Sequence, residues 1–258
     1  MKLESFGISD IGRKRQKNED SFFINKDINL FIVADGMGGH AAGEKASKFA
    51  VEAINQFIEH THAGEELTWP FAFDPRLSMI ENRVKAAIHI AHKKIVEMAQ
   101  EDFNLKGMAT TVVTTLFDNG VLHIGHVGDS RAYLVRESKI IQLTTDHSWI
   151  NEQLRCGIIN AQQAKSHPFK NVVTRALGGP QELEVDMISE KLVTDDIILL
   201  CSDGLTSMVD DKDLATIVVT FRNDIEQAGK KLVELANSKG GNDNITIVLI
   251  HYMENDGK

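Results

Sequence analysis

Four aspartates share one local setting, directly before or after an apolar run and beside glycine, serine or asparagine. They are Asp35 in VADGMGG, Asp129 in HVGDSRAYL, Asp203 in LLCSDGL and Asp243 in GGNDNITIVLI. Asp-Gly is a common hairpin signal, which would give Asp35 a purely structural role. However, the pattern after Asp35 and after Asp203 is helical, so neither dipeptide closes a two-residue hairpin. Carboxylates on loops at strand ends are typical of catalytic and metal-binding groups.

If these carboxylates converge, bound cations are expected, because like charges that share a site raise one another's pKa. The loops supply only oxygen donors, without a Cys pair or a His-x-x-x-His pattern, which favours Mg²⁺ or Mn²⁺ over structural zinc. Two such ions roughly 3.5–4 Å apart can activate water and clamp both oxygens of an in-line displacement at phosphorus. Hydrolytic phosphoryl transfer is therefore the predicted chemistry.

A site for phosphate should also contain a guanidinium group, which grips phosphate oxygens in pairs where a lysine cannot. The stretch GRKRQKNED offers Arg13 and Arg15. The remaining composition agrees with a local rather than a general attraction for anions. With 28 Lys and Arg against 37 Asp and Glu, the formal charge is -9, which argues against non-specific nucleic-acid binding.

Two cysteines are too few for a disulfide framework, and the N-terminal stretch lacks the apolar segment of a signal peptide. No run reaches the ~18 apolar residues that a membrane span requires. These features predict a cytoplasmic protein with neither a membrane nor a nucleic acid as partner.

The elements that must hold the aspartates are short runs rich in Val, Ile, Thr and Phe, separated by a few residues, which predict antiparallel sheets. The predicted strands include the runs at residues 109–117 and 182–189. Helical spacing covers residues 42–59, 77–100 and 225–238, and Asn223-Asp224 is a start signal for the last of these. Long helices inserted between groups of strands favour an α+β class over repeated βαβ units. Without repeats or an obvious linker, we expect a single domain over residues 1–258.

Eight motifs in register resemble the PPM-type, metal-dependent Ser/Thr protein phosphatases, in their compact bacterial branch. They are GRKRQKNED, VADGMGGH, GMATT, HVGDSRAYL, TTDHS, NVVTRALG, LLCSDGL and GGNDNITIVL. The resemblance spans residues 8–250. It implies a β-sandwich of two antiparallel sheets flanked by helix pairs (αββα), a metal centre at one end, and a small helical flap at about residues 145–178. It also implies hydrolysis of phosphoserine and phosphothreonine on proteins by a water that bridges two metal ions.

The resemblance assigns metal-binding roles to five of the residues. Asp35 matches the carboxylate that bridges the two core ions, and Gly36 matches the backbone carbonyl ligand of the second ion. Asp203 and Asp243 match the remaining ligands of the first ion. Asp129 matches a ligand of a third ion, which it would share with Asp203.

The first motif supplies the other assigned residues. Arg15 matches the phosphate clamp, Glu19 the acid that holds a water on the second ion, and Asp20 a neighbour that orients ligands, whereas Arg13 is expected to be a solvated charge. Met37 stands where other branches carry a histidine that protonates the leaving alcohol. The general acid is therefore unassigned, and His40 is the nearest imidazole in the sequence.

The implied cofactor is Mn²⁺ or Mg²⁺, and the implied partners are phosphoproteins, including a Ser/Thr kinase and its targets, acted on by a monomer. A pseudophosphatase is an alternative, but it would have lost a metal-binding aspartate, and none is lost. A metal-dependent phosphodiesterase or nuclease is disfavoured by the acidic balance. Phosphatases of stress or sporulation pathways usually carry a sensor domain, for which we find no room. The long connection at residues 61–79 is a further candidate for function.

Overall fold

The computed structural model describes residues 2–38, 42–62, 71–165, 167–180 and 182–253, and these form two antiparallel sheets. The first sheet has the order β1 (Lys2–Asp10), β11 (Ile245–Met253), β10 (Ile197–Cys201), β7 (Arg131–Arg136) and β8 (Lys139–Gln142). The second has the order β2 (Asp20–Asn25), β3 (Leu30–Met37), β5 (Val112–Asp118), β6 (Val121–Val127) and β9 (Asp186–Lys191), and β4 (Ala109–Thr110) pairs with β3.

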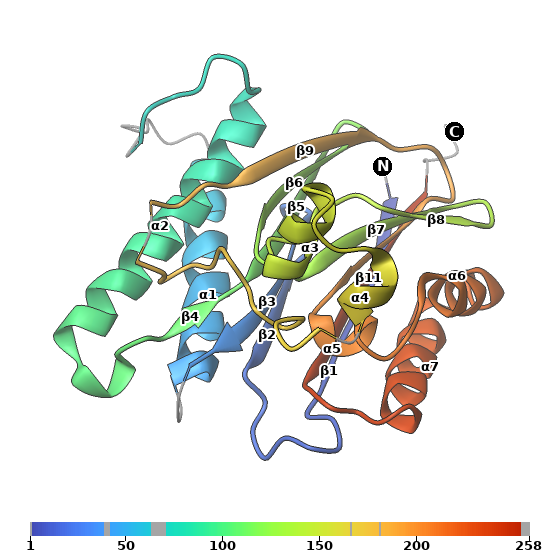
Figure 1. Cartoon of the computed structure of the whole chain (residues 1–258). Helices are drawn as coiled ribbons and strands as arrows, with labels where there is room; N and C mark the ends of the chain where they lie inside the picture. Colours follow the sequence, from blue (N-terminus) through green and yellow to red (C-terminus); the bar gives the residue numbers. More distant parts are fainter. Residues whose placement is uncertain (1, 39–41, 63–70, 166, 181, 254–258) are drawn as a thin grey trace.

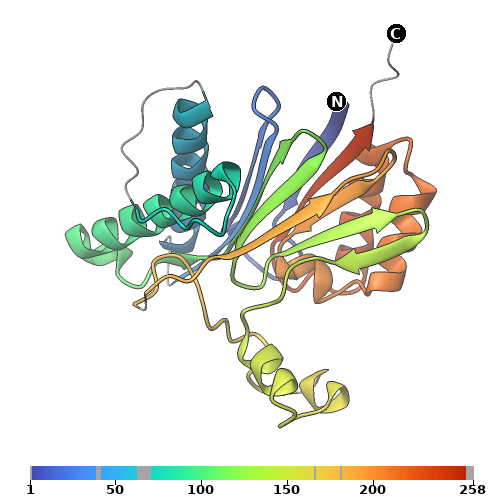
Figure 2. The ribbon, with the colours of Figure 1, turned by 90° about the horizontal axis from the view of Figure 1, so that it is seen from above.

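A pair of helices covers the outer face of each sheet (Figures 1 and 2). The second sheet packs against α1 (Ala42–His62) and α2 (Met79–Glu101), and the first against α6 (Asp211–Thr220) and α7 (Ile225–Ser238). Two short helical segments lie outside these pairs, namely α5 (Asp203–Thr206) and the 3-10 helix η1 (Phe103–Leu105). The predicted α+β sandwich with flanking helix pairs is confirmed.

Alternation along the central strands divides their side chains between two apolar cores. In β10, Ile197 and Leu199 pack under α6 and α7, whereas Ile198 and Leu200 lie between the two sheets. All four are at most 1 % exposed. Burial of one such aliphatic side chain stabilises the fold by about 1.5–3 kcal/mol. The continuous apolar run of this strand therefore fixes both faces of the first sheet.

The predicted helices are confirmed, with small shifts of their ends, but two of the strand predictions were inaccurate. The N-cap of α7 is Asp224, which accepts a hydrogen bond from the backbone N–H of Gln227 at 2.9 Å, as the start signal indicates. The run at residues 109–117 is two strands, because the N–H of Asp35 on β3 donates to the hydroxyl of Thr111 at 3.1 Å instead of to its carbonyl, which interrupts the ladder at that residue. The run at 182–189 becomes a strand only from Asp186.

The segment at residues 145–178 protrudes from the sandwich and carries α3 (Trp149–Arg155) and α4 (Ala161–Lys165) (Figure 2). We call it the flap. Its two ends are joined where Ser148 pairs with Val173 and the N–H of Trp149 donates to the carbonyl of Val172 at 2.9 Å. The flap is therefore helical, as predicted, and is closed at its base.

The sequence also predicts that no segment spans a membrane, and it singles out the long connection at residues 61–79. No helix in the described parts of the chain combines the length and the apolar character needed to cross a membrane. Residues 63–70 of the long connection at 61–79 lie outside the described residues, and so does His40.

Candidate active site

The predicted acidic residues meet at one hollow of about 240 Å³ at an end of the sandwich. Its lining includes seven residues that were singled out from the sequence, namely Arg15, Glu19, Asp35, Gly36, Asp129, Asp203 and Asp243. Asp20 is the one predicted residue that does not line it. Residues up to 228 positions apart in the chain thus come together.

Neighbouring strands bring the four aspartates together. Asp35 lies near the end of β3, and Asp129 follows β6 in the same sheet. Asp203 follows β10 and begins α5, and Asp243 precedes β11, which pairs with β10. One end of the sandwich therefore receives carboxylates from both sheets.

Gly36 is required at its position because two other segments of backbone, at Glu19 and at Gly43, crowd around it. Its N–H donates to the carbonyl of Glu19 at 3.1 Å. A Cβ atom at Gly36 would overlap that same carbonyl and the carbonyl of Gly43 in α1. A residue with any side chain would therefore push the β3 backbone away from the strand and helix that frame the hollow.

Asp20 lies behind the wall of the hollow and supports Asp35. The two aspartates face each other across the β2–β3 ladder, and Asp20 is 9 % exposed. Ser202 donates a hydrogen bond from its Oγ to Oδ2 of Asp20 at 2.7 Å. Burial raises the pKa of Asp20 to about 7, and the nearby Asp203 adds to the effect. This position suits an orienting group rather than one that touches a substrate.

The acidic residues oppose one another's ionisation. Burial raises the pKa of Asp35 well above its ordinary value, and repulsion from Asp20, Asp203 and Asp129 raises it further. Burial and the Asp203 charge raise the pKa of Asp129 to about 7, and burial and the Asp243 charge raise that of Asp203 to about 6. Carboxylates in this state need positive charge close by to remain ionised at neutral pH.

Among the described residues that line the hollow, Arg15 is the one cation. Its Nη2 donates to Oδ2 of Asp243 at 2.6 Å, and its side chain is 51 % exposed. A single arginine cannot balance five carboxyl groups. The donor set, carboxylates plus the Gly36 carbonyl, consists of hard oxygen atoms, which is what Mg²⁺ and Mn²⁺ prefer. The residues therefore fit divalent cations.

Arg13 and Arg15 are two residues apart but occupy different surroundings. Arg13 does not line the hollow, and its N–H donates to the carbonyl of Gly241 at 2.7 Å. Arg15 lies at the hollow with its guanidinium beside Asp243. Only Arg15 is therefore placed to contact a phosphate among the acidic groups.

Asn244 is a residue of the site that the sequence did not single out. Its Oδ1 accepts from the N–H of Glu19 at 2.8 Å, and its Nδ2 donates to the carbonyls of Ile11 and Lys17 at 3.0 and 2.9 Å. One side chain thus holds the loop that carries Arg15 and Glu19. The available signal was its place directly after Asp243, since Asn side chains often fix the backbone of loops.

The flap contributes to the same hollow through Asn171 and Val173. Met37 also lines the hollow, so the position at which other branches of the family carry a histidine belongs to the site. His40 lies outside the described residues. No general acid is thereby assigned.

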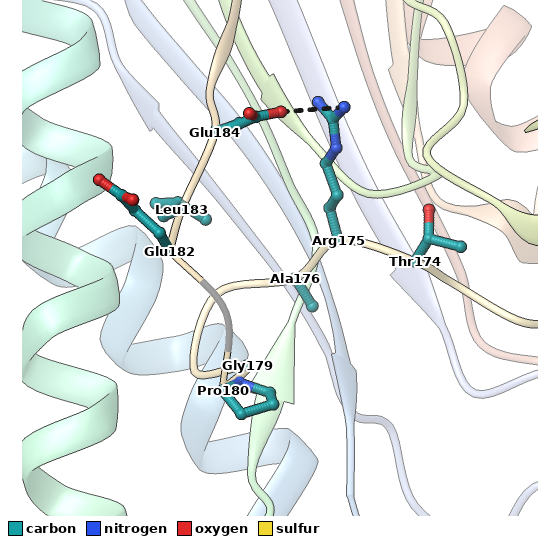
Figure 3. Close-up of a pocket in the computed structure, with 8 residues that line it drawn as sticks. All are labelled: Thr174, Arg175, Ala176, Gly179, Pro180, Glu182, Leu183 and Glu184. Atoms are coloured by element: carbon teal, nitrogen blue, oxygen red, sulfur yellow. Dashed lines mark ion pairs between the residues drawn. The ribbon is translucent and has the colours of Figure 1, made fainter.

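A smaller hollow of about 90 Å³ lies where the flap returns to the sandwich (Figure 3). Arg175 reaches over it but is neutralised, because its guanidinium pairs with Glu184 at 3.0 Å and with Asp186 at 3.3 Å. Glu182 adds a further negative charge to the lining. This hollow is therefore poorly suited to an anionic phosphate.

Replacing Asp129 by Asn is expected to stabilise the metal-free protein at alkaline pH. The pKa of Asp129 is about 7 in the fold against 3.8 as its ordinary value. Between these values the native state binds a proton that the unfolded chain has released, so this group's contribution to stability falls as pH rises and is fully unfavourable above pH 7. We expect the melting temperature of Asp129→Asn to exceed that of the wild type by a few degrees at pH 8. The difference should shrink towards pH 4, and a difference independent of pH would contradict this electrostatic picture.

Comparison with known proteins identifies the family of the chain. Residues 11–237 match the family model described as protein phosphatase 2C. The serine/threonine phosphatase stp of Listeria monocytogenes is 40 % identical over 248 residues, which cover 94 % of this chain and 93 % of that protein. The chain belongs to the protein phosphatase 2C family, and it is a metal-dependent serine/threonine phosphatase.

Solved structures show the same fold. The Mycobacterium tuberculosis serine/threonine phosphatase PstP/Ppp superposes with a TM-score of 0.85 at 32 % identity, covering 98 % of this chain and 99 % of that chain. The catalytic domain of PstP in complex with two manganese ions has a TM-score of 0.81 at 30 % identity, covering 98 % and 99 % of the two chains. The predicted family and fold are confirmed.

Proposed function

We propose that the acidic hollow is the catalytic centre and that it holds two divalent cations, Mn²⁺ or Mg²⁺. Asp35 would bridge the two ions, with the Gly36 carbonyl on the second and with Asp203 and Asp243 on the first. Asp129 and Asp203 would hold a third ion. The observation that carries this proposal is the convergence of these oxygen donors on one hollow with a single arginine. The two manganese ions of the related PstP structure support it.

When bound, the ions would supply an activated water and positive charge that offsets the charge developing on the phosphoryl group. The residues of this chain perform the remaining tasks. Glu19, on the loop that Asn244 holds, would orient a water at the second ion. Asp20, behind Asp35, would keep that carboxylate in place across the strand pair. Arg15 would turn its guanidinium towards the phosphate of the substrate.

The substrates are phosphoproteins, since the relatives act as serine/threonine phosphatases. We propose that they include a Ser/Thr kinase and its targets and that the enzyme works as a monomer. Both proposals can be tested with purified protein, by incubating it with an autophosphorylated bacterial kinase and by measuring its mass in solution. Phosphate release from the kinase and a mass near 28.6 kDa are expected.

Arg15→Ala is expected to lower kcat/KM for a phosphothreonine peptide by at least about tenfold, because a charge-assisted, two-point contact with phosphate is lost. Arg13→Ala should have little effect, since Arg13 lies away from the hollow. Arg15→Lys keeps the charge but not the paired geometry, so its kcat/KM should lie between those of Arg15→Ala and the wild type. Equal losses in Arg13→Ala and Arg15→Ala would refute the assignment of Arg15.

A further inference from the structure

The turn that carries Asp129 is held by the first residues of the flap. His147 makes two hydrogen bonds with Gly128, the residue of this turn that precedes Asp129. The backbone N–H of His147 donates to the carbonyl of Gly128 at 2.7 Å, and the N–H of Gly128 donates to Nδ1 of His147 at 3.1 Å. Both backbone polar groups of the residue before Asp129 are therefore bonded to His147, which is 6 % exposed.

Asp146 holds the other side of the same turn through Arg131. Nε of Arg131 donates to Oδ1 of Asp146 at 2.8 Å and Nη2 donates to Oδ2 at 2.6 Å, which makes a two-point ion pair. Nη1 of Arg131 donates to the hydroxyl of Tyr133 at 2.8 Å, so the guanidinium is held on three sides. The two side chains are 25 % and 15 % exposed, and such paired contacts fix direction as well as distance.

A third set of contacts ties the turn to Asp35. Ser130 and Thr111 share a hydrogen bond between their hydroxyls at 2.7 Å, and the Thr111 hydroxyl also accepts from the N–H of Asp35 at 3.1 Å. Gly128 has φ +112°, and a Cβ there would overlap the Thr111 side chain. The backbone of the turn is thus held between Thr111 on one side and His147 on the other.

His147 also touches the other end of the flap. Its carbonyl accepts from the N–H of Thr174 at 2.8 Å, and its Nε2 lies 3.1 Å from Oδ2 of Asp186, which in turn pairs with Arg175. Both ends of the flap and the Asp129 turn therefore meet at one buried residue, His147.

We propose that Asp146 and His147 are positioning residues that fix Asp129 for the third cation and connect that position to the flap. The inference rests on the proposed function, because Asp146 and His147 can position Asp129 for a cation only if Asp129 binds one. Positioning groups of this kind commonly change metal affinity by about 10–100-fold when they are replaced.

The donor atoms of His126, His147 and Asp186 lie within 4.8 Å of one another, an arrangement that could also hold a metal ion. The bond from Gly128 decides against His147 as a ligand in this arrangement. Because Nδ1 accepts a hydrogen bond, the neutral ring carries its proton on Nε2, the atom that would have to face the ion. The ring of His126 packs against this ring at a tilt of 36°, with 4.7 Å between centroids, and burial lowers the pKa of His126 to about 3. A neutral, packed imidazole pair suits positioning.

Two substitutions of His147 separate its contacts. His147→Asn places an amide oxygen near the position of Nδ1 and keeps an acceptor for Gly128. His147→Gln places its amide near Nε2, which keeps the approach to Asp186 and loses the bond from Gly128. We expect His147→Gln to weaken the weakest Mn²⁺ binding event by roughly 10–100-fold in calorimetry, while His147→Asn stays near the wild type.

Asp146→Asn should weaken the same event, because it breaks the two-point pair with Arg131. Strand β7 provides a matched control at its other end, where Arg136 makes an equivalent pair with Asp196 at 2.9 and 2.8 Å. Asp196→Asn should lower the melting temperature to a similar or greater extent and leave Mn²⁺ binding unchanged. Equal losses of Mn²⁺ binding in Asp146→Asn and Asp196→Asn would show a general structural effect and overturn the inference.

The kinetic readout distinguishes positioning from simple loss of fold. In His147→Gln and Asp146→Asn we expect kcat to fall, and to recover when Mn²⁺ is raised by the same factor as the loss of affinity. Asp129→Asn is the reference variant for both measurements, because it removes the proposed ligand itself. If Asp129→Asn leaves Mn²⁺ binding unchanged, the proposed third site is wrong. If Asp129→Asn weakens binding but the flap variants do not, the proposed site stands and the positioning role is wrong.

Discussion

Asp35→Asn is expected to reduce turnover of a phosphothreonine peptide by at least about 100-fold, the loss seen when a group that supports transition-state charge is removed. Burial raises the pKa of Asp35, and the acids around it, Asp20, Asp203, Asp129 and Asp243, raise it further. A carboxylate in the middle of such a group is the one best placed to contact two cations at once. The amide keeps the shape of the side chain but cannot supply the bridging charge.

A control for Asp35→Asn should remove a carboxylate without touching the hollow. Asp213 is suitable, since it lies in α6 and pairs with Lys239 at 2.6 Å on the surface. Asp213→Asn should keep wild-type kcat and KM, because exposed ion pairs contribute little. Wild-type kinetics in Asp35→Asn would show that the catalytic centre lies elsewhere.

Removal of divalent cations is expected to abolish hydrolysis, which is the largest effect of all. When no cation is bound, burial and mutual repulsion raise the pKa values of Asp35, Asp129 and Asp203. The carboxylates that do ionise repel one another and also repel an anionic substrate. Protein treated with a chelator and then freed of it should show no turnover, and Mn²⁺ or Mg²⁺ should restore it. Ca²⁺ is a useful comparison, because its larger and more flexible coordination fits the same ligands less well.

Undiminished turnover in fully metal-depleted protein would contradict this prediction. So would restoration by a monovalent salt alone, since that outcome would reduce the role of the cations to general screening. The same preparations should be melted in parallel, so that a loss of activity can be separated from a loss of fold.

The sandwich could be predicted from the sequence because its strands and helices obey local patterns. In β10, alternation assigns Ile198 and Leu200 to one core and Ile197 and Leu199 to the other. The exceptions arise where a side chain takes the place of a backbone group in the ladder. Thr111 interrupts its strand because its hydroxyl, and not its carbonyl, accepts from the N–H of Asp35, which lies 76 positions away.

The acids of the site could also be predicted, since each lies at a strand end where the pattern changes. Their supports could not. Asn244 holds the loop that carries Glu19 from 225 positions away, and Ser202 bonds Asp20 from 182 positions away. Nothing local in the sequence marks such pairs, because a hydrogen bond between distant loops leaves no periodicity. The same reason hid the contact between His147 and Gly128.

The central claim is that the acidic hollow binds the catalytic cations, and calorimetric titration with Mn²⁺ tests it most directly. Metal-free wild-type protein should bind at least two Mn²⁺ ions per chain, and Asp35→Asn should lose at least one of these binding events while Asp213→Asn keeps them all. An isotherm for Asp35→Asn that is identical to the wild-type isotherm would contradict the account.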